Sequence, residues 1–175
     1  MQPTRFLVIR DDQVRRRVHQ LFYEANLDAA LGYTADRKDL YKSLKLEGIL
    51  EAPQNVCVLC EQDSAQGHGL GRQTMPEAAI YSTVCAVQNL WLAARVEGVG
   101  VGWVSILDMP RLRTLLNVPD HLVIVAYLCV GYVAQFGAGP ELERAGWEIR
   151  RSVDECIAID CCPEAWQVPG TATSV

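Results

Sequence analysis

Cysteine offers this chain the widest choice of chemistry, because a thiol can bind a metal, form a disulfide or act as a nucleophile. The sequence contains seven cysteines. Cys57 and Cys60 have C-x-x-C spacing, but they fall in a strand predicted over residues 55–61, where residues three apart point to opposite faces. The odd number and the apolar surroundings favour free buried thiols that pack as small hydrophobic side chains.

Three further cysteines, Cys156, Cys161 and Cys162, stand close together just before a tail that contains Pro, Gly and Thr. A metal site is the alternative interpretation of this cluster. No histidine stands near it at ligand spacing, so the signal is weak and we predict no metal site.

Histidine offers general acid or base chemistry at three positions, His19, His68 and His121. His68 lies in G-H-G-L-G at residues 67–71, inside a polar loop predicted over residues 62–73. These glycines resemble a phosphate-binding turn only superficially, because dinucleotide fingerprints follow a strand and open directly into a helix. A flexible flap beside a ligand is the alternative. We expect His68 to be solvated, and His19 and His121 to be surface or capping residues.

Arg15, Arg16 and Arg17 form the densest run of positive charge in the chain. Phosphate binding is one interpretation of such a run. These arginines lie in the middle of a predicted helix with no glycine turn to aim them, so we favour a solvated helix face.

Length and charge exclude several classes of protein. The chain has 175 residues, half of them hydrophobic, and this predicts one folded domain with a sizeable core. A net charge of -5 argues against a nucleic-acid surface. No run reaches the roughly 18 apolar residues of a membrane span, because Gln88, Asn89 and Arg95 interrupt the long apolar helix, so we expect no membrane span. We also expect no signal peptide and a cytoplasmic location.

A long apolar helix is the element around which the chain is organised. Thr74 and Glu77 predict a capping box at its start, and residues 80–96 are apolar on almost every face. Such a helix is normally buried by neighbouring elements or by a partner subunit. Gly98 and Gly100 predict its end, and a strand is predicted from Val101 to Ile106.

The remaining pattern mixes strands and helices without strict alternation, which favours an α+β fold. Strands are predicted over residues 6–9, 55–61 and 122–133, and helices over 14–25, 36–48, 110–116 and 152–159. Residues 140–146 are predicted to form a polar turn. Gly131 indicates a close approach of another backbone or a ligand. This organisation predicts a ligand pocket near residues 100–105, without yet identifying the ligand.

A resemblance to a known family extends along nearly the whole chain. Its longest parts are Y-S-T-V-C-A-V-Q-N-L-W-L-A-A-R at residues 81–95 and E-G-V-G-V-G-W-V-S-I at residues 97–106. Shorter matches follow the same order: M-Q-P at 1–3, L-K-L-E-G-I at 44–49, L-G-R at 70–72, P-D-H at 119–121, P-E-L at 140–142 and G-W at 146–147. On these residues the chain resembles the BluB-type 5,6-dimethylbenzimidazole synthases of the flavin nitroreductase-like superfamily.

The resemblance implies a mixed sheet flanked by helices, in an interwoven homodimer with FMN at the subunit interface. The implied flavin domain covers residues 1–162, and residues 163–175 are expected to be a flexible tail. The implied reaction is the breakdown of reduced FMN by molecular oxygen to 5,6-dimethylbenzimidazole, the lower ligand of vitamin B12, and erythrose 4-phosphate. A flavin reductase is a further implied partner. The protein then mainly positions the flavin and controls access of water and oxygen.

The resemblance also implies site residues. Ser105 matches the family's active-site serine, whose hydroxyl can donate or accept a proton; a serine capping the helix near Pro110 is the alternative. Backbone at Val101, Gly102 and Trp103 is expected against the flavin ring. Leu70 fits the loop over the flavin. Arg150 fits an arginine that clamps the phosphate, with a surface ion pair as the alternative. Gln2 is expected to hydrogen-bond the flavin or to begin the first strand.

Two departures from the family's pattern bear on activity. Family members carry a further N-terminal segment with an R-R-D motif, which supplies phosphate contacts and an aspartate, so we expect this chain to be a shortened version. Thr4 stands where the family usually has tryptophan. Losing charge-assisted phosphate contacts at about 1.5–3 kcal/mol each would weaken FMN binding. Two alternatives therefore stay open, an NAD(P)H-dependent nitroreductase and a flavin-binding dimer that no longer catalyses.

Overall fold

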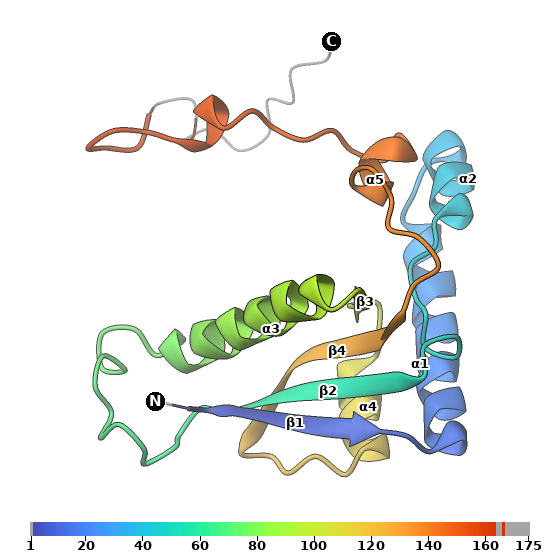
Figure 1. Ribbon diagram of the computed structural model, residues 1–175. Coiled ribbons are helices and arrows are strands. Elements are labelled where there is room, and N and C mark those ends of the chain that lie inside the picture. The colour runs from blue at the N-terminus through green and yellow to red at the C-terminus, as the bar shows by residue number, and fades with distance from the viewer. Residues whose placement is uncertain (1, 164–165, 167–175) are drawn as a thin grey trace. The chain divides into compact units, whose positions relative to one another are not determined.

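The computed structural model describes residues 2–163 and residue 166, and the chain divides after Phe136 into two units. The first unit contains the sheet and its covering helices (Figure 1). The second begins at Gly137 and is described by itself below. Met1 and most of the predicted tail, residues 164–165 and 167–175, lie outside the described residues. The predicted domain boundary between residues 162 and 163 stays a prediction.

Four strands form the sheet of the first unit in the order β1-β2-β4-β3. They are β1 (Thr4–Ile9), β2 (Gln54–Glu61), β3 (Val99–Val104) and β4 (Leu122–Tyr132). Every pair of neighbouring strands in this sheet is antiparallel. The α+β class is confirmed, while the expected mixture of strand directions is wrong for the strands described. This pairing brings the start of β1 and the end of β3 to the same end of the sheet, on opposite edges.

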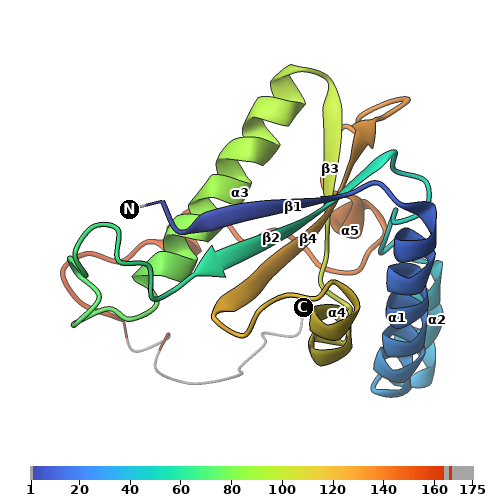
Figure 2. The same ribbon diagram turned by 90° about the horizontal axis from the view of Figure 1, so that it is seen from below.

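The two faces of the sheet have separate hydrophobic clusters. Helix α3 (Ala78–Val96) lies along one face, where Val87 packs with Val58, Ala126 and Leu128. Helices α1 (Asp12–Leu31) and α4 (Met109–Leu115) pack on the other cluster, and α1 stands beside one end of the sheet (Figure 2). The cluster formed with α1 and α4 is the larger of the two. Its completely buried members include Val18, Ile49, Cys57, Leu112 and Tyr127.

Helix α3 confirms the predicted apolar helix, but it starts without the predicted capping box. The residue at its N-cap is Glu77, whose side chain makes no capping hydrogen bond. The Thr74 hydroxyl donates instead to the carbonyl of Gly71, and residues 75–77 form a turn. At the other end, Gly98 has a positive φ of 71° and ends the helix as expected. Gly100 belongs to β3 rather than to the turn.

Three other predicted elements differ from the structure in length or kind. Helix α2 (Ala35–Ser43) is shorter than predicted, because Leu44 has an extended backbone that carries Leu46 and Ile49 toward the core. The predicted polar turn at residues 140–146 contains a short helix, α5 (Glu141–Arg144). The predicted last helix is reduced to a single 3-10 turn, η1 (Asp154–Cys156).

A buried polar network joins the sheet to the segment that follows α2. The Tyr127 hydroxyl on β4 donates to Oδ1 of Asn55 on β2 at 2.8 Å, and Nδ2 of Asn55 donates to the carbonyl of Ile49 at 3.2 Å. All three residues are completely buried. Burial raises the pKa of Tyr127 far above its ordinary value, so the hydroxyl keeps the proton that it donates.

The close approach predicted at Gly131 is present. A Cβ atom built on Gly131 would lie 2.5 Å from Cδ of Pro53, which is closer than real side chains approach one another. The absence of a side chain at this position therefore lets Pro53 pack directly on β4.

The cysteines divide into buried and exposed thiols, and all seven are free. Cys57, Cys60 and Cys129 are buried, and burial raises the pKa of Cys57 to about 12 and that of Cys129 to about 11. Cys85, Cys156, Cys161 and Cys162 are exposed. The prediction of free thiols is confirmed, although burial applies to three of them. Within residues 2–163 and 166, no three His, Cys, Asp or Glu side chains gather closely enough to hold a metal.

The second unit has no core of its own among its described residues. None of residues 137–163 or 166 is buried, and Ile149, Val153 and Ile159 are at least 70% exposed. A segment with this many exposed aliphatic side chains cannot gain much stability by itself.

Candidate functional site

Ser105 lies immediately after the last residue of β3 and is exposed. Its carbonyl accepts a hydrogen bond from the amide of Leu107 at 3.0 Å. The N-cap of α4 is Asp108, whose carboxylate accepts from the amide of Arg111 at 3.0 Å. The alternative of a helix-capping serine is therefore wrong, and the Ser105 hydroxyl makes no hydrogen bond within the described part of the chain.

Strand β3 has an open backbone position at Gly102, within the stretch where the flavin ring is expected. Val101 packs against the cluster beneath α3, and Trp103 is 37% exposed. A Cβ atom built on Gly102 would meet nothing within 4 Å. The backbone at Gly102 is therefore open to direct approach by a flat ligand, and in this respect the residues present fit a flavin ring.

Gln2 lies at the mouth of a groove between the start of β1 and helix α3. The groove has a volume of about 480 Å³, which is within the range of small-molecule sites. It is lined by residues 2–6 together with Gln66, Ser82 and Ala86. The sheet order places Gln2 and Ser105 toward the same end of the sheet but on opposite edges, three strand spacings of about 4.8 Å apart across the sheet, and the register offsets them further along the strands.

Leu70 stands on a chain of overlapping tight turns between β2 and α3. The amides of His68, Leu70 and Arg72 donate to carbonyls three residues earlier at 3.0–3.2 Å. Gly67, Gly69 and Gly71 have positive φ values, and so does His68 at 52°. Nη1 of Arg72 donates to the carbonyl of Gln62 at 2.7 Å and closes the loop at its base. The Leu70 side chain is 87% exposed, and the His68 side chain is exposed, as expected for a solvated histidine.

Arg150 belongs to the second unit, where it is exposed and lies outside any helix or strand. The structure therefore places Gln2 and Ser105 toward one end of the sheet of the first unit, on opposite edges, whereas Arg150 belongs to the separately described second unit. The predicted phosphate contact of Arg150 stays a prediction.

The solvated helix face predicted for the arginine run at the start of α1 is present at two of its three positions. Arg16 and Arg17 are exposed. Arg15 is largely buried, and its guanidinium donates to the carbonyl of Ala52 and to Asp12. Arg15 therefore fastens the segment after α2 to the helix, a structural role that the run of charges does not indicate.

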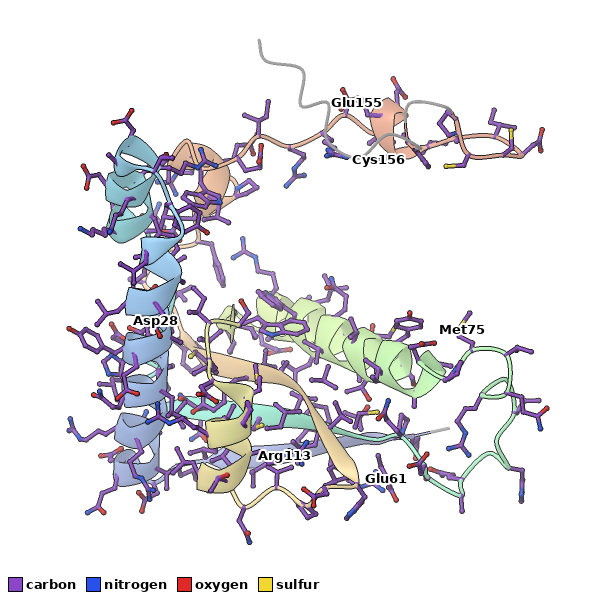
Figure 3. The ribbon with its side chains drawn as sticks, turned by 180° about the vertical axis from the view of Figure 1, so that it is seen from behind. Asp28, Glu61, Met75, Arg113, Glu155 and Cys156 are labelled. Atoms are coloured by element: carbon purple, nitrogen blue, oxygen red, sulfur yellow. The ribbon has the colours of Figure 1, made fainter. Side chains whose placement is uncertain are left out.

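Sequence reasoning missed an ion pair beside Gln2. Nη2 of Arg5 on β1 lies 2.6 Å from Oε2 of Glu61 at the end of β2, and Figure 3 labels Glu61 at that end of the strand. Nη1 of Arg5 donates to the carbonyls of Gln2 and Thr4, each at 3.1 Å. Opposite charges 56 residues apart carry no local signal, so this pair could be found only once the strand register was known.

The outward face of α3 carries several exposed apolar side chains, together with the polar residues Gln88, Asn89 and Arg95. Tyr81, Leu92 and Val96 are 54%, 57% and 84% exposed, and Val84 and Cys85 lie on the same exposed surface. Only Ala79, Thr83 and Val87 of this helix are buried against the sheet. Contiguous exposed apolar side chains of this kind mark interaction surfaces.

Comparison with known sequences identifies the family. The sequence profile of the Nitroreductase family matches residues 1–132, which is more than half of the chain. The chain belongs to the nitroreductase family. Within it, the 5,6-dimethylbenzimidazole synthase of Rhodospirillum rubrum is 46% identical over 150 residues, covering 86% of this chain and 71% of that protein. The resemblance read from the sequence is thereby confirmed.

Solved structures support the nitroreductase fold. Iodotyrosine deiodinase, in a crystal structure with FMN and 3-iodo-L-tyrosine, superposes with a TM-score of 0.63 at 20% identity over 79% of this chain and 72% of that one. A BluB-like flavoprotein from Clostridium difficile gives 0.61 at 16% identity over 90% of this chain and 80% of that one. None of the helices within the described residues of this nitroreductase-family chain is long and apolar enough to span a membrane.

Proposed function

We propose that this chain is a 5,6-dimethylbenzimidazole synthase, which breaks down reduced FMN with molecular oxygen to 5,6-dimethylbenzimidazole and erythrose 4-phosphate. The dimethylbenzimidazole serves as the lower ligand of cobalamin. The observation that carries this proposal is the 46% identity to a protein of that name, over 86% of the chain. The proposal makes the flavin both cofactor and substrate.

We propose that the flavin lies along the sheet end that Gln2 and Ser105 share. Gly102 leaves one side of β3 without a side chain, and Trp103, which points to the opposite side of the strand, adds an exposed apolar surface there. The Gln2 amide can donate to a ring carbonyl or accept from a ring N–H, which orients the ring in its plane. Leu70, at the tip of the turn-rich loop, covers the ring and excludes water.

Reduced FMN supplies the electrons for the reaction with oxygen and the carbon skeleton of the product. The proposed role of Ser105 is to hold or move a proton at its Oγ. That hydroxyl is exposed and makes no hydrogen bond within the described chain, so it is available to donate to or accept from a bound ligand. A charged phosphate contact is assigned to Arg150, whose planar guanidinium suits a phosphate group.

A homodimer is the proposed assembly, and a second copy is the proposed cover for the outward face of α3. The helix is apolar on both sides, and its own sheet buries only one of them. The exposed aliphatic side chains of the second unit need a comparable cover. Both features agree with the interwoven homodimer that the resemblance implies.

A separate flavin reductase is the proposed source of reduced FMN, because a flavin that is consumed must be supplied afresh for every turnover. We place the reaction in the cytoplasm. All seven cysteines are free thiols, which is the state that a reducing compartment maintains.

The test is to incubate the chain with FMN, NADH, a flavin reductase and oxygen, and to measure 5,6-dimethylbenzimidazole by chromatography and mass spectrometry. We expect product in air and none without oxygen, and Ser105→Ala should lower its rate by about 100-fold or more, as for a lost proton-transfer group. Ser152→Ala, an exposed serine in the second unit, is the matched control. Steady NAD(P)H oxidation by the chain alone with intact flavin would instead identify a nitroreductase. Failure to take up FMN would identify a chain that has lost catalysis.

A further inference from the structure

We infer that Arg5 is a positioning residue, which Glu61 anchors and which holds Gln2 in the orientation that the flavin requires. The inference deepens the proposed function. Only the contact between Gln2 and the flavin depends on that proposal. The claim about how Gln2 is held concerns the flavin-free chain and stands by itself.

The contacts of Arg5 connect the end of β2 to the residue before the start of β1. One guanidinium nitrogen, Nη2, pairs with the Glu61 carboxylate at 2.6 Å. The other, Nη1, donates to the carbonyl of Gln2 at 3.1 Å and to that of Thr4 at the same distance. An arginine fork donates to the carboxylate from one nitrogen and to the two carbonyls from another in a fixed plane, whereas a lysine has only a single donor nitrogen.

The backbone beside Gln2 is fixed independently of Arg5. The amide of Glu61 donates to the carbonyl of Pro3 at 2.8 Å, which continues the β1–β2 ladder by one residue. Pro3 is fully buried, whereas Gln2 is exposed beyond it. Of the contacts described for Gln2, the one with Arg5 is the hydrogen bond that fixes its peptide, so the place from which its side chain leaves the backbone depends on Arg5.

The orientation of Gln2 matters because Gln2 lines the groove in which a ligand can bind. Both Gln2 and Arg5 line it, and the pairing with Glu61 offsets the positive charge of Arg5. Arg5 therefore acts here less as an anion-binding residue than as a clamp on the chain. The Arg5 side chain is 52% exposed and Glu61 30% exposed, and ion pairs this exposed contribute little to overall stability. A loss of Gln2 orientation should consequently be separable from a loss of folding.

The first arm of the test uses the flavin-free full chain labelled with ¹⁵N. The backbone amide signal of Gln2, assigned by its displacement in Gln2→Ala, should show restricted motion in the wild type, because Arg5 holds the backbone carbonyl of this residue. In Arg5→Ala and in Glu61→Ala it should become mobile, while Arg5→Lys should be intermediate. Arg10→Ala, an exposed arginine directly after β1, is the matched control and should change nothing. A Gln2 signal that is unchanged in Arg5→Ala would overturn the inference.

The second arm is a double-mutant cycle on FMN affinity, measured by quenching of FMN fluorescence. Arg5→Ala should raise the Kd about two- to tenfold, the range for one lost hydrogen bond, at an unchanged melting temperature. The same change in a Gln2→Ala background should have no further effect, because Arg5 acts through Gln2. Additive effects would show that Arg5 contacts the flavin or its phosphate directly and would overturn the positioning role. Failure of the wild type to form dimethylbenzimidazole would refute the proposed function alone, since both arms are read without turnover.

Discussion

The polar network beneath α1 gives the sharpest stability prediction, through the substitution Tyr127→Phe. The change removes one hydroxyl and leaves Oδ1 of Asn55 without the donor that now lies 2.8 Å away. Both side chains are completely buried, so water cannot replace the lost partner. A buried acceptor left without a donor costs about 1–3 kcal/mol. We expect the free energy of unfolding to fall by that amount and the melting temperature to fall by about 2–4 °C for each kcal/mol.

Urea unfolding followed by circular dichroism measures the effect. Tyr132→Phe is the matched control, because it makes the same chemical change on the same strand at a side chain that is 84% exposed. We expect the control to stay within about 0.5 kcal/mol of the wild type. If Tyr127→Phe also stays within that margin, with an unchanged dependence on urea, the network contributes no net stability and the reasoning is refuted.

Three further predictions concern packing, thiols and pH. Gly131→Ala should lower the free energy of unfolding in urea by about 1–3 kcal/mol, because its Cβ would lie 2.5 Å from Cδ of Pro53. Gly102→Ala is the control and should leave the free energy of unfolding unchanged, because a Cβ there meets no atom within 4 Å. Equal losses of stability in the two variants would contradict this prediction. If the proposed dimer covers Cys85, a thiol reagent at pH 8 should react with three cysteines in the native protein and with all seven in denaturant. Reaction of four cysteines in the native protein would show that Cys85, and with it the α3 surface, is uncovered. The hydrogen bond from Lys45 lowers the pKa of Glu51, and that bond in turn raises the pKa of Lys45. The pair therefore stabilises the fold between their ordinary values of 4.5 and 10.5, and this contribution is lost as pH falls through the lowered pKa of Glu51 or rises through the raised pKa of Lys45. Lys45→Met should accordingly cost up to about 1 kcal/mol at pH 7 and nothing at pH 2; an equal cost at both would refute the assignment.

Local sequence patterns were sufficient to predict the central elements. The apolar run of α3, Gly98 with its positive φ, and the long apolar run of β4 each predict their element from neighbouring residues alone. The close packing at Gly131 follows from the same kind of local signal.

Features in which a residue can choose between several hydrogen-bond, packing or ion-pair partners were not predictable from the sequence. The Thr74 hydroxyl has two acceptable partners, and the carbonyl of Gly71 replaces the predicted cap because the preceding glycines turn the chain. Helix α2 ends early because the core takes up Leu46 and Ile49, and this gain exceeds that of another helical turn. The pairing of Arg5 with Glu61 depends on strand register, which only the folded sheet sets.

The distribution of thiols bears on how such a protein tolerates its own chemistry. Reactions of reduced flavins with oxygen expose nearby side chains to oxidants, and thiolates are oxidised much faster than thiols. Cys57 and Cys129 stay protonated inside the core, so they resist this damage at any physiological pH. Cys85 on the surface of α3 and the three cysteines of the second unit are exposed in the isolated chain, so oxidants can reach them. Ageing in air should therefore affect the assembly of the protein before it affects the fold.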